Sequence, residues 1–244
     1  MIRSLRSAAT GMNAQQLNLD NISNNLANVN TTAFKEEKTF FTLLDQAMNS
    51  EDTNELEAAL RGQEVLSRGA VNLGDGPLLA TNRELDLALT GSGYFVVETP
   101  RGIRYTRNGS LFIGNGAVLT TADGFPVLGE RGRITVGPGK LTVNGQGEVF
   151  LNGSRIDRLK FVTFQNPGGL LREGSSLLAP EDGQKEIAAA SMEVRQGYLE
   201  QSNVNAIASV VGMVAILRQF EAIQKSVSVL MNDVDAKAIE RLSR

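Results

Sequence analysis

The clearest pattern in the chain lies between Ile207 and Leu242, a stretch with no proline and with Gly212 as its one glycine. It predicts one long helix, whose start Asn203 or Asn205 is placed to cap. The apolar residues of this helix form two stripes at alternating three- and four-residue spacing. One stripe is Ile207, Val210, Val214 and Leu217, and the other is Met213, Ile216, Phe220, Ile223, Val227, Leu230 and Val234. A single partner helix would not cover both stripes.

The beginning of the chain carries a weaker pattern of the same kind. Its apolar residues at helical spacing are Ile2, Leu5, Ala9, Met12, Leu19, Ile22 and Leu26, and Gln15 and Gln16 interrupt them. Burying one stripe of seven side chains would return roughly 10–20 kcal/mol, which is less than ordering such a long backbone costs. The long C-terminal helix alone is therefore marginal. We predict that the two terminal helices pair as a coiled-coil-like domain.

Glycine marks a different kind of structure in the middle of the chain. All glycines except Gly11 and Gly212 lie between Gly62 and Gly197. Many belong to turn dipeptides, and the segments between them alternate apolar and polar residues, as at 94–97, 134–136 and 160–164. Short strands joined by tight turns have this pattern. The predicted fold is therefore α+β, with a central all-β domain of short strands between the two long terminal helices.

The predicted boundaries divide the chain into four parts. Residues 1–35 form the N-terminal helical part of the terminal-helix domain, and residues 36–62 form a connector whose first half, 36–48, is predicted to be a short helix. Residues 63–197 form the central β-domain, and residues 198–244 contain the C-terminal long helix.

Composition narrows the possible functions. The net charge of −3 does not favour a nucleic-acid partner, and the absence of histidine and cysteine removes the usual general base and the thiolate metal ligands. No uninterrupted apolar run approaches the length of a membrane span, so we expect no membrane insertion. The first fifteen residues lack the apolar segment and cleavage site of a secretory signal, so we expect export, if any, without a cleaved signal peptide.

Candidate sites for chemistry are few. A glycosidase-like pair could be drawn from scattered carboxylates, namely Glu84, Asp86, Glu98, Asp123, Glu130 and Glu148, but such residues on a β-domain are usually a solvated face. Gly91-Ser92-Gly93 precedes a strand and is better explained as a turn than as a dinucleotide fingerprint. Asp233-Val234-Asp235 lacks the rest of a calcium loop. We predict no enzyme, no cofactor and no metal site.

Two segments resemble the signatures of the bacterial flagellar rod and hook family. The first is Asn24-Asn25-Leu26-Ala27-Asn28 followed by Thr32-Ala33-Phe34-Lys35, and the second is Gly197-Tyr198-Leu199-Glu200-Gln201-Ser202-Asn203-Val204-Asn205 followed by Arg218-Gln219-Phe220-Glu221-Ala222 and Lys225. Three central segments, 85–96, 105–109 and 124–129, are similar to the family's β-domain. One departure is Ala33, where the family usually has glycine. Because alanine resists positive φ, we expect a different turn there.

The resemblance implies a structural, axial protein of the flagellar basal body, in the rod that spans the periplasm. Its implied partners are other copies of itself, neighbouring rod proteins and the flagellar export apparatus. The size, and residues 126–136, resemble the proximal-rod type more than the distal-rod type. The rod would be a helical tube that transmits torque and carries an export channel.

We expect assembly to use apolar and amide side chains of both terminal helices. The expected interface residues are Leu19, Ile22, Asn24, Asn25, Leu26, Asn28, Ile207, Val214, Leu217, Phe220, Ile223, Val227 and Leu230. The asparagines would serve either to link neighbours or to cap their own helix. The alternative functions are a distal-rod or hook relative, a carbohydrate-acting enzyme on the β-domain, and a peripheral membrane protein that uses an amphipathic end.

Overall fold

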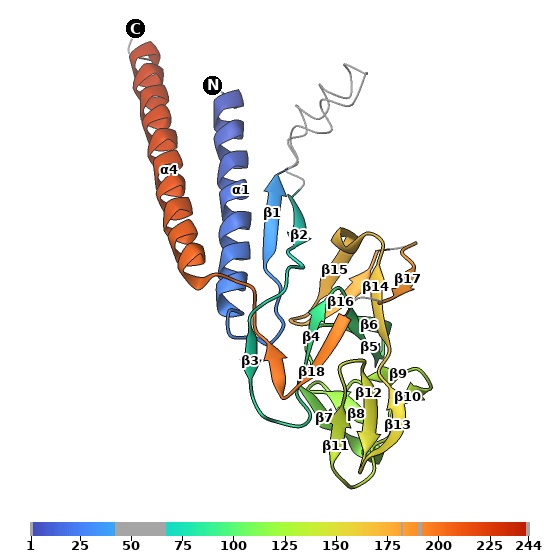
Figure 1. Cartoon of the computed structure of the whole chain (residues 1–244). Helices are drawn as coiled ribbons and strands as arrows, with labels where there is room; N and C mark the ends of the chain where they lie inside the picture. The colour runs from blue at the N-terminus through green and yellow to red at the C-terminus, as the bar shows by residue number, and fades with distance from the viewer. Residues whose placement is uncertain (1, 42–66, 182, 190–191, 243–244) are drawn as a thin grey trace. The chain divides into compact units, whose positions relative to one another are not determined.

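The computed structural model describes residues 2–41, 67–181, 183–189 and 192–242. The chain divides into two compact units, and each is described by itself. The helical unit contains residues 1–26, 37–70 and 205–244. The β-unit contains residues 27–36 and 71–204. Figure 1 shows the elements in chain order.

The helical unit contains the two α-helices of the described chain, α1 (Ile2–Ala27) and α4 (Ala206–Leu242). The predicted single C-terminal helix is confirmed. Asn205 caps its start, because its Oδ1 accepts a hydrogen bond from the Ala208 amide at 3.0 Å. The cap satisfies one of the amides that a helix start leaves without an intrahelical partner.

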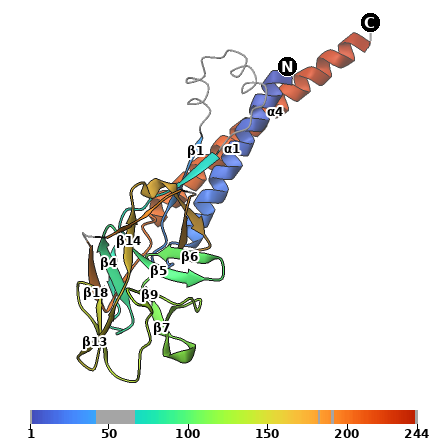
Figure 2. The same ribbon diagram turned by 90° about the vertical axis from the view of Figure 1, so that its right-hand side faces the viewer.

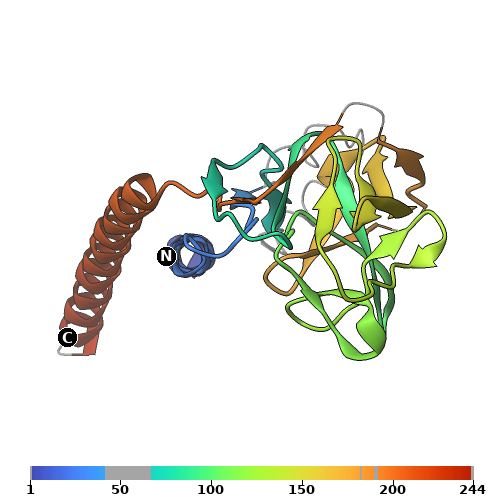
Figure 3. The ribbon, with the colours of Figure 1, turned by 60° about the horizontal axis from the view of Figure 1, so that its bottom comes forward.

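The predicted coiled-coil-like pairing of the two helices is wrong. They touch at separate points: Gln15 donates to Gln219 at 3.0 Å, and a Cβ added at Gly212 would lie 3.4 Å from Ile22 Cδ1. Figure 3, which looks almost along α1, shows α4 inclined to it. Most of the apolar side chains of α4 whose burial is described, between residues 206 and 231, are exposed. The reason lies in α1, where polar residues interrupt the apolar spacing and leave no continuous seam.

Strand β1 (Glu37–Phe41) pairs with β2 (Ser67–Val71) in the helical unit. The sequence predicts a short helix from residue 36, so the structure differs at 37–41, and the rest of that prediction lies outside the described residues. Threonine and phenylalanine in β1 favour strand over helix. The Asn25 side chain also pairs with the backbone of Glu37, which holds that residue extended.

The predicted β region is a set of short antiparallel strands (Figure 2). Its largest sheet has the order β15-β16-β6-β5-β14-β17. These strands are β15 (Leu170–Glu173), β16 (Leu177–Pro180), β6 (Gly102–Thr106), β5 (Tyr94–Thr99), β14 (Phe161–Phe164) and β17 (Glu186–Ala188). Two of the three segments predicted as strands are confirmed, and residues 134–136 instead form a single bridge through Thr135.

Smaller sheets and turns complete the β-unit. A three-stranded sheet joins β11 (Leu141–Val143), β12 (Glu148–Leu151) and β13 (Ser154–Arg158). The remaining strand pairs are β3 (Leu78–Ala80) with β19 (Tyr198–Glu200), β4 (Leu87–Gly91) with β18 (Met192–Gln196), β7 (Leu111–Ile113) with β8 (Leu119–Thr121), and β9 (Leu128–Gly129) with β10 (Gly132–Arg133). Short 3-10 turns lie at Asn115–Ala117 and Pro167–Gly169.

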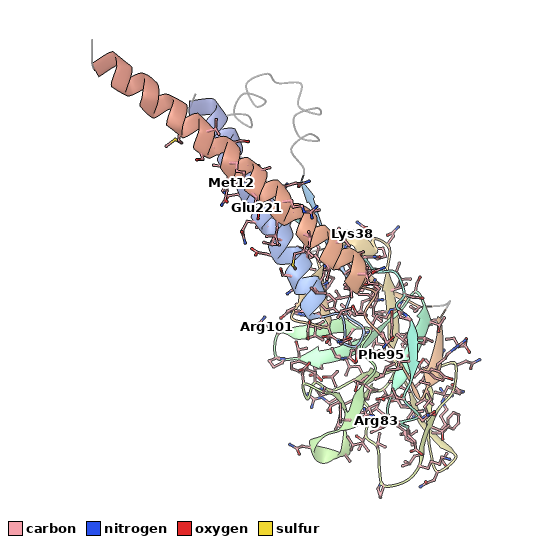
Figure 4. All side chains as sticks on the ribbon, turned by 90° about the vertical axis from the view of Figure 1, so that its left-hand side faces the viewer. Met12, Lys38, Arg83, Phe95, Arg101 and Glu221 are labelled. Atoms are coloured by element: carbon pink, nitrogen blue, oxygen red, sulfur yellow. The ribbon has the colours of Figure 1, made fainter. Side chains whose placement is uncertain are left out.

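Two apolar clusters form the core of the β-unit. The larger surrounds Phe95, Leu119 and Val149, and the smaller surrounds Val96, Tyr105 and Phe164. Because successive residues of a strand face opposite sides, Phe95 and Val96 of β5 point into different clusters. Figure 4 labels Phe95 among the strands of this unit. Strand β5 therefore supplies the centre of the unit.

The turn at Ala33 keeps a left-handed conformation although the residue is alanine. Its φ is +56° and the residue is buried. The expectation of a different turn is therefore wrong. Hydrogen bonds on both sides hold the conformation, since the Ala33 amide bonds the Glu200 carbonyl and the Phe34 amide bonds the Thr31 carbonyl.

Candidate functional site

One side of helix α4 presents a row of exposed apolar side chains. Ile207 is 79% exposed, Val210 46%, Val214 44% and Leu217 43%. We call these four residues the open stripe. The second predicted stripe differs: Ile216 is 6% exposed, and Met213, Phe220, Ile223 and Val227 are half-buried. Its last two members, Leu230 and Val234, have side chains outside the described residues. The helical unit therefore covers one stripe in part and leaves the other in solvent, as the two-stripe pattern predicts.

Helix α4 is also apolar overall. Residues Ala206–Val229 are long and apolar enough, by length and composition, to cross a membrane, although only 6% of the most apolar window is buried inside the protein. The expectation of no membrane insertion, which is drawn from uninterrupted apolar runs, stays a prediction. Ser209, Gly212 and Gln219 interrupt the apolar runs without removing the high mean hydropathy.

The predicted interface residues of α1 lie in varied surroundings. Leu19, Ile22 and Leu26 are half-buried and Asn24 is exposed. Asn25 is buried: its Nδ2 donates to the Glu37 carbonyl at 2.8 Å and its Oδ1 accepts from the Glu37 amide at 3.0 Å. Asn28 accepts a hydrogen bond from the Thr31 hydroxyl at 3.2 Å. These bonds lie within the chain, and the role of the predicted set in assembly stays a prediction.

The second candidate site is a group of polar residues in the β-unit, the buried Lys35, Arg107 and Glu200 and the half-buried Asn203, which we call the clasp. Lys35 Nζ donates to Glu200 Oε1 at 2.5 Å and to the Gly74 carbonyl at 2.7 Å. The Lys35 side chain is 4% exposed and the Glu200 side chain 0%. The pair joins two residues that lie 165 positions apart in the sequence.

Arg107 lies on the other side of Glu200. Its Nη1 is 3.5 Å from Glu200 Oε2, and its Nη2 is 3.3 Å from Asp75 Oδ1. The guanidinium also donates to the carbonyls of Leu89 and Gly91 in β4. Two cations and two carboxylates thus meet in this part of the protein. Glu200 Oε1 additionally accepts the Gly76 amide at 2.8 Å, so this oxygen has two donors, whereas the buried Oε2 lies near the Arg107 charge without a hydrogen bond.

Asn203 connects three segments of backbone. Its Oδ1 accepts from the Glu36 amide at 2.7 Å, and its Nδ2 donates to the carbonyls of Asn72 and Gly74 at 2.8 and 2.9 Å. Its own amide donates to the Phe34 carbonyl at 3.2 Å. The clasp therefore ties the segment that follows α1 and the segment that precedes α4 to the same loop of the β-unit.

Burial and charge act in opposite directions on Lys35. Burial lowers the pKa of its ammonium below the usual value, while the charge and hydrogen bond of Glu200 oppose that shift. Burial likewise raises the pKa of Tyr94, whose ring lies 5.4 Å from the Arg107 guanidinium carbon. Such a group is suited to holding segments together, because each charge depends on its partners for stabilisation.

The candidate catalytic carboxylates do not converge on a cleft. Several are held in ion pairs: Asp86 with Arg83 at 2.7 Å, Glu98 with Arg133 at 2.7 Å, and Glu148 with Arg155 at 2.9 Å. Glu84 and Asp123 are exposed, and Glu130 lies 3.5 Å from Arg158. A cavity of about 10 Å³ beside the clasp, lined by residues including Ala33, Ser175 and Leu178, has room for about one water molecule.

Sequence reasoning missed the clasp. Lys35, Glu200 and Asn203 lie inside the two segments that resemble the family signatures, but their spacing does not indicate that they meet. A charged residue within each signature was the available signal. Arg107, the fourth member, follows the buried Thr106 on β6; it lies in the segment 105–109 that resembles the family's β-domain, but its spacing does not indicate that it meets the other three.

Comparisons with known proteins agree with the two signatures. Residues 5–35 match the family model "Flagella basal body rod protein", residues 88–151 match "Flagellar hook protein FlgE/F/G D1 domain", and residues 195–233 match "Flagellar basal body rod FlgEFG protein C-terminal". The first and last models contain the segments that meet in the clasp.

Individual relatives match over nearly their whole length. The chain is 32% identical to the flagellar basal-body rod protein FlgG of Buchnera aphidicola subsp. Schizaphis graminum, over 93% of this chain and 95% of the relative. It is 30% identical to FlgF of Caulobacter vibrioides, over 93% and 92%, and 31% identical to FlgG of Bacillus subtilis, over 93% and 95%. Relatives named FlgG and relatives named FlgF match to a similar degree, so the comparisons do not separate the proximal-rod type from the distal-rod type. The chain belongs to the family of flagellar basal-body rod proteins.

Proposed function

We propose that this chain, a structural component of the flagellar basal-body rod, polymerises through its terminal helices into a helical tube. The single observation that supports this proposal is the open stripe on α4, which a lone chain leaves in water. An exposed apolar row of this length is typical of an interface. In the rod, a second copy or a neighbouring rod or hook protein would cover it.

The energetics favour several contacts for each subunit. Covering the four side chains of the open stripe would return less than the roughly 6–12 kcal/mol expected for four fully exposed side chains, because Val210, Val214 and Leu217 are already more than half covered. Association costs an estimated ~4–15 kcal/mol in lost translation and rotation. One contact over this stripe therefore gives a weak pair, and a stable polymer needs further surfaces. A head-to-tail contact that does not close into a ring builds a helical filament, which supplies these additional neighbours.

The proposal extends to torque and export. A tube of α4 helices held to β-units would carry torque along its wall and leave a central channel for later subunits. The flagellar export apparatus would deliver the chain before its terminal helices are covered. The clasp fits this view, because it anchors the segment that follows α1 and the segment that precedes α4 within the β-unit.

The test replaces Val214 and Leu217 with aspartate in the full chain. The matched control is Ser228→Asp, at an exposed polar position of the same helix. We expect the double variant to retain the thermal unfolding of the β-unit and to lose rod assembly and motility in a complemented strain, while the control keeps both. Normal motility of the double variant would contradict the proposal.

A second candidate function is membrane association through α4, because Ala206–Val229 passes the length and composition test for a span. Arg218, Glu221 and Lys225 are the charged residues of this segment, which is few for an interfacial lipid-binding helix. Co-sedimentation of the purified chain with anionic vesicles tests it. Binding that Val214→Asp with Leu217→Asp abolishes would favour the membrane function, and no binding would exclude it.

A further inference from the structure

Two short segments of the β-unit meet in the clasp. Residues 31–36, the N-terminal stem, follow α1, and residues 197–204, the C-terminal stem, precede α4. The stems bond each other directly: the Ala33 amide donates to the Glu200 carbonyl at 2.8 Å, and the Asn203 amide donates to the Phe34 carbonyl at 3.2 Å. Lys35 with Glu200, and Glu36 with Asn203, add two side-chain links.

The two stems differ in what else holds them. The C-terminal stem has partners of its own, because β19 pairs with β3 from Tyr198 to Glu200 and the Gln201 amide donates to the Pro77 carbonyl at 2.8 Å. Glu200 also keeps the Gly76 amide and the Arg107 guanidinium. Without the N-terminal stem, this stem would retain its strand pairing, and Glu200 would retain one hydrogen bond and one counter-charge.

The N-terminal stem also has contacts outside the C-terminal stem, because Arg172 donates to the Lys35 carbonyl and lies over the Phe34 ring, and the Asn72 amide donates to the Glu36 carbonyl at 2.7 Å. Its buried charge, however, depends on the C-terminal stem. Glu200 is the nearest counter-charge of the buried Lys35 ammonium, which also donates to the neutral Gly74 carbonyl. The amides of Ala33 and Glu36 bond to residues of the C-terminal stem. Removal of that stem would leave Lys35 and Arg107 as two buried cations without the carboxylate that lies between them. Arg107 would keep Asp75 at 3.3 Å, but Lys35 would lose its nearest counter-charge, and a buried charge that loses its partner is strongly unfavourable.

We propose that the N-terminal stem docks only on a β-unit whose C-terminal stem is already in place, so that the clasp acts as a completion check on the chain. Because a chain is made from its N-terminus, Lys35 exists long before Glu200 does. The stem that leads out of α1 therefore becomes fixed only after residues up to 204 are available. The proposal concerns folding of the single chain and does not depend on rod assembly.

Hydrogen exchange read by mass spectrometry on the full-length soluble chain tests this order. Glu200→Gln removes the buried charge with little change in shape, and Lys35→Met removes its partner. Glu193→Gln, on the exposed face of β18, is the matched control. We expect Glu200→Gln to speed exchange at Ala33 and Glu36 by about tenfold or more, with β5 and β6 still protected. Lys35→Met should speed exchange at Gln201 by a smaller factor.

A milder variant keeps the test decisive if Glu200→Gln unfolds the chain. Asn203→Ala leaves every charge in place and removes the side-chain bond to the Glu36 amide, so it too should speed exchange in residues 31–36 before β5 and β6. Unchanged exchange in residues 31–36 in these variants would overturn the proposal. The proposal would also be overturned if Lys35→Met sped exchange in the C-terminal stem more than Glu200→Gln sped exchange in the N-terminal stem. A uniform rise in the exchange rate over the whole β-unit would overturn it as well.

Discussion

Glu200→Gln should destabilise the β-unit more than Lys35→Met, although each substitution removes one charge of the Lys35–Glu200 pair. Glu200→Gln leaves Lys35, which is 4% exposed, beside Arg107 with no buried carboxylate between them. Breaking a buried pair in this way costs about 3–5 kcal/mol. Lys35→Met leaves Glu200 with the Gly76 amide and Arg107, so the loss should be smaller, about 1–3 kcal/mol for unmade hydrogen bonds.

Thermal and urea unfolding of the full chain measure both losses. At about 2–4 °C per kcal/mol for a unit of this size, Glu200→Gln should lower the Tm of the β-unit by roughly 6–20 °C. The control Glu193→Gln should change the unfolding free energy by no more than about 0.5 kcal/mol. The double variant Lys35→Met with Glu200→Gln should lose less than the sum of the single losses, because the two residues interact directly.

Two outcomes would refute this reasoning. One is a loss below about 1 kcal/mol for Glu200→Gln, which would mean that the pair is solvated or replaceable. The other is a larger loss for Lys35→Met than for Glu200→Gln, which would mean that Glu200, and not Lys35, depends on the pair.

Three further predictions concern other parts of the structure. Gly76→Ala should destabilise the β-unit by about 1–3 kcal/mol in urea unfolding, because a Cβ there would lie 2.1 Å from the Gln201 carbonyl oxygen. The control Gly137→Ala should be nearly neutral, because its Cβ would lie 3.4 Å from Leu151. Burial tends to raise the pKa of Glu186, but hydrogen bonds from Lys160 and Tyr105 hold it below the usual value. Ionised Glu186 therefore stabilises the fold at pH values above its pKa in the unfolded chain, and this contribution is lost as pH falls through its lower pKa in the folded chain. Glu186→Gln should accordingly flatten the fall of Tm below about pH 4.5 relative to Glu84→Gln, and an unchanged slope would contradict the assignment. Asn25→Ala should expose the Glu37 amide to faster hydrogen exchange at a cost of about 1–3 kcal/mol, whereas Asn13→Ala, at an exposed position of α1, should not.

The sequence predicts those elements whose signal is local. The long α4 helix, its Asn205 cap and its two stripes follow from residue spacing, and the β-unit follows from turn glycines between short alternating segments. The turn at Asn152 and Gly153 is one example, with both residues at positive φ as a two-residue hairpin turn requires.

Features that depend on distant parts of the chain were missed. The spacing on α1 resembles a coiled-coil stripe, but the interrupting glutamines prevent a continuous seam, and spacing alone does not measure how well two helices fit. Strand β1 is set in part by the Asn25 side chain twelve residues earlier. Lys35 and Glu200 meet across 165 residues, which no local pattern encodes.

The account depends most on the claim that the open stripe is exposed in the single chain and covered in the rod. Hydrogen exchange over residues 206–229, measured on the soluble chain and on assembled rods, tests this claim directly. We predict fast exchange in the soluble chain, because a helix with an uncovered apolar face is marginal, and strong protection in the rod. Equal protection in both states would contradict the account.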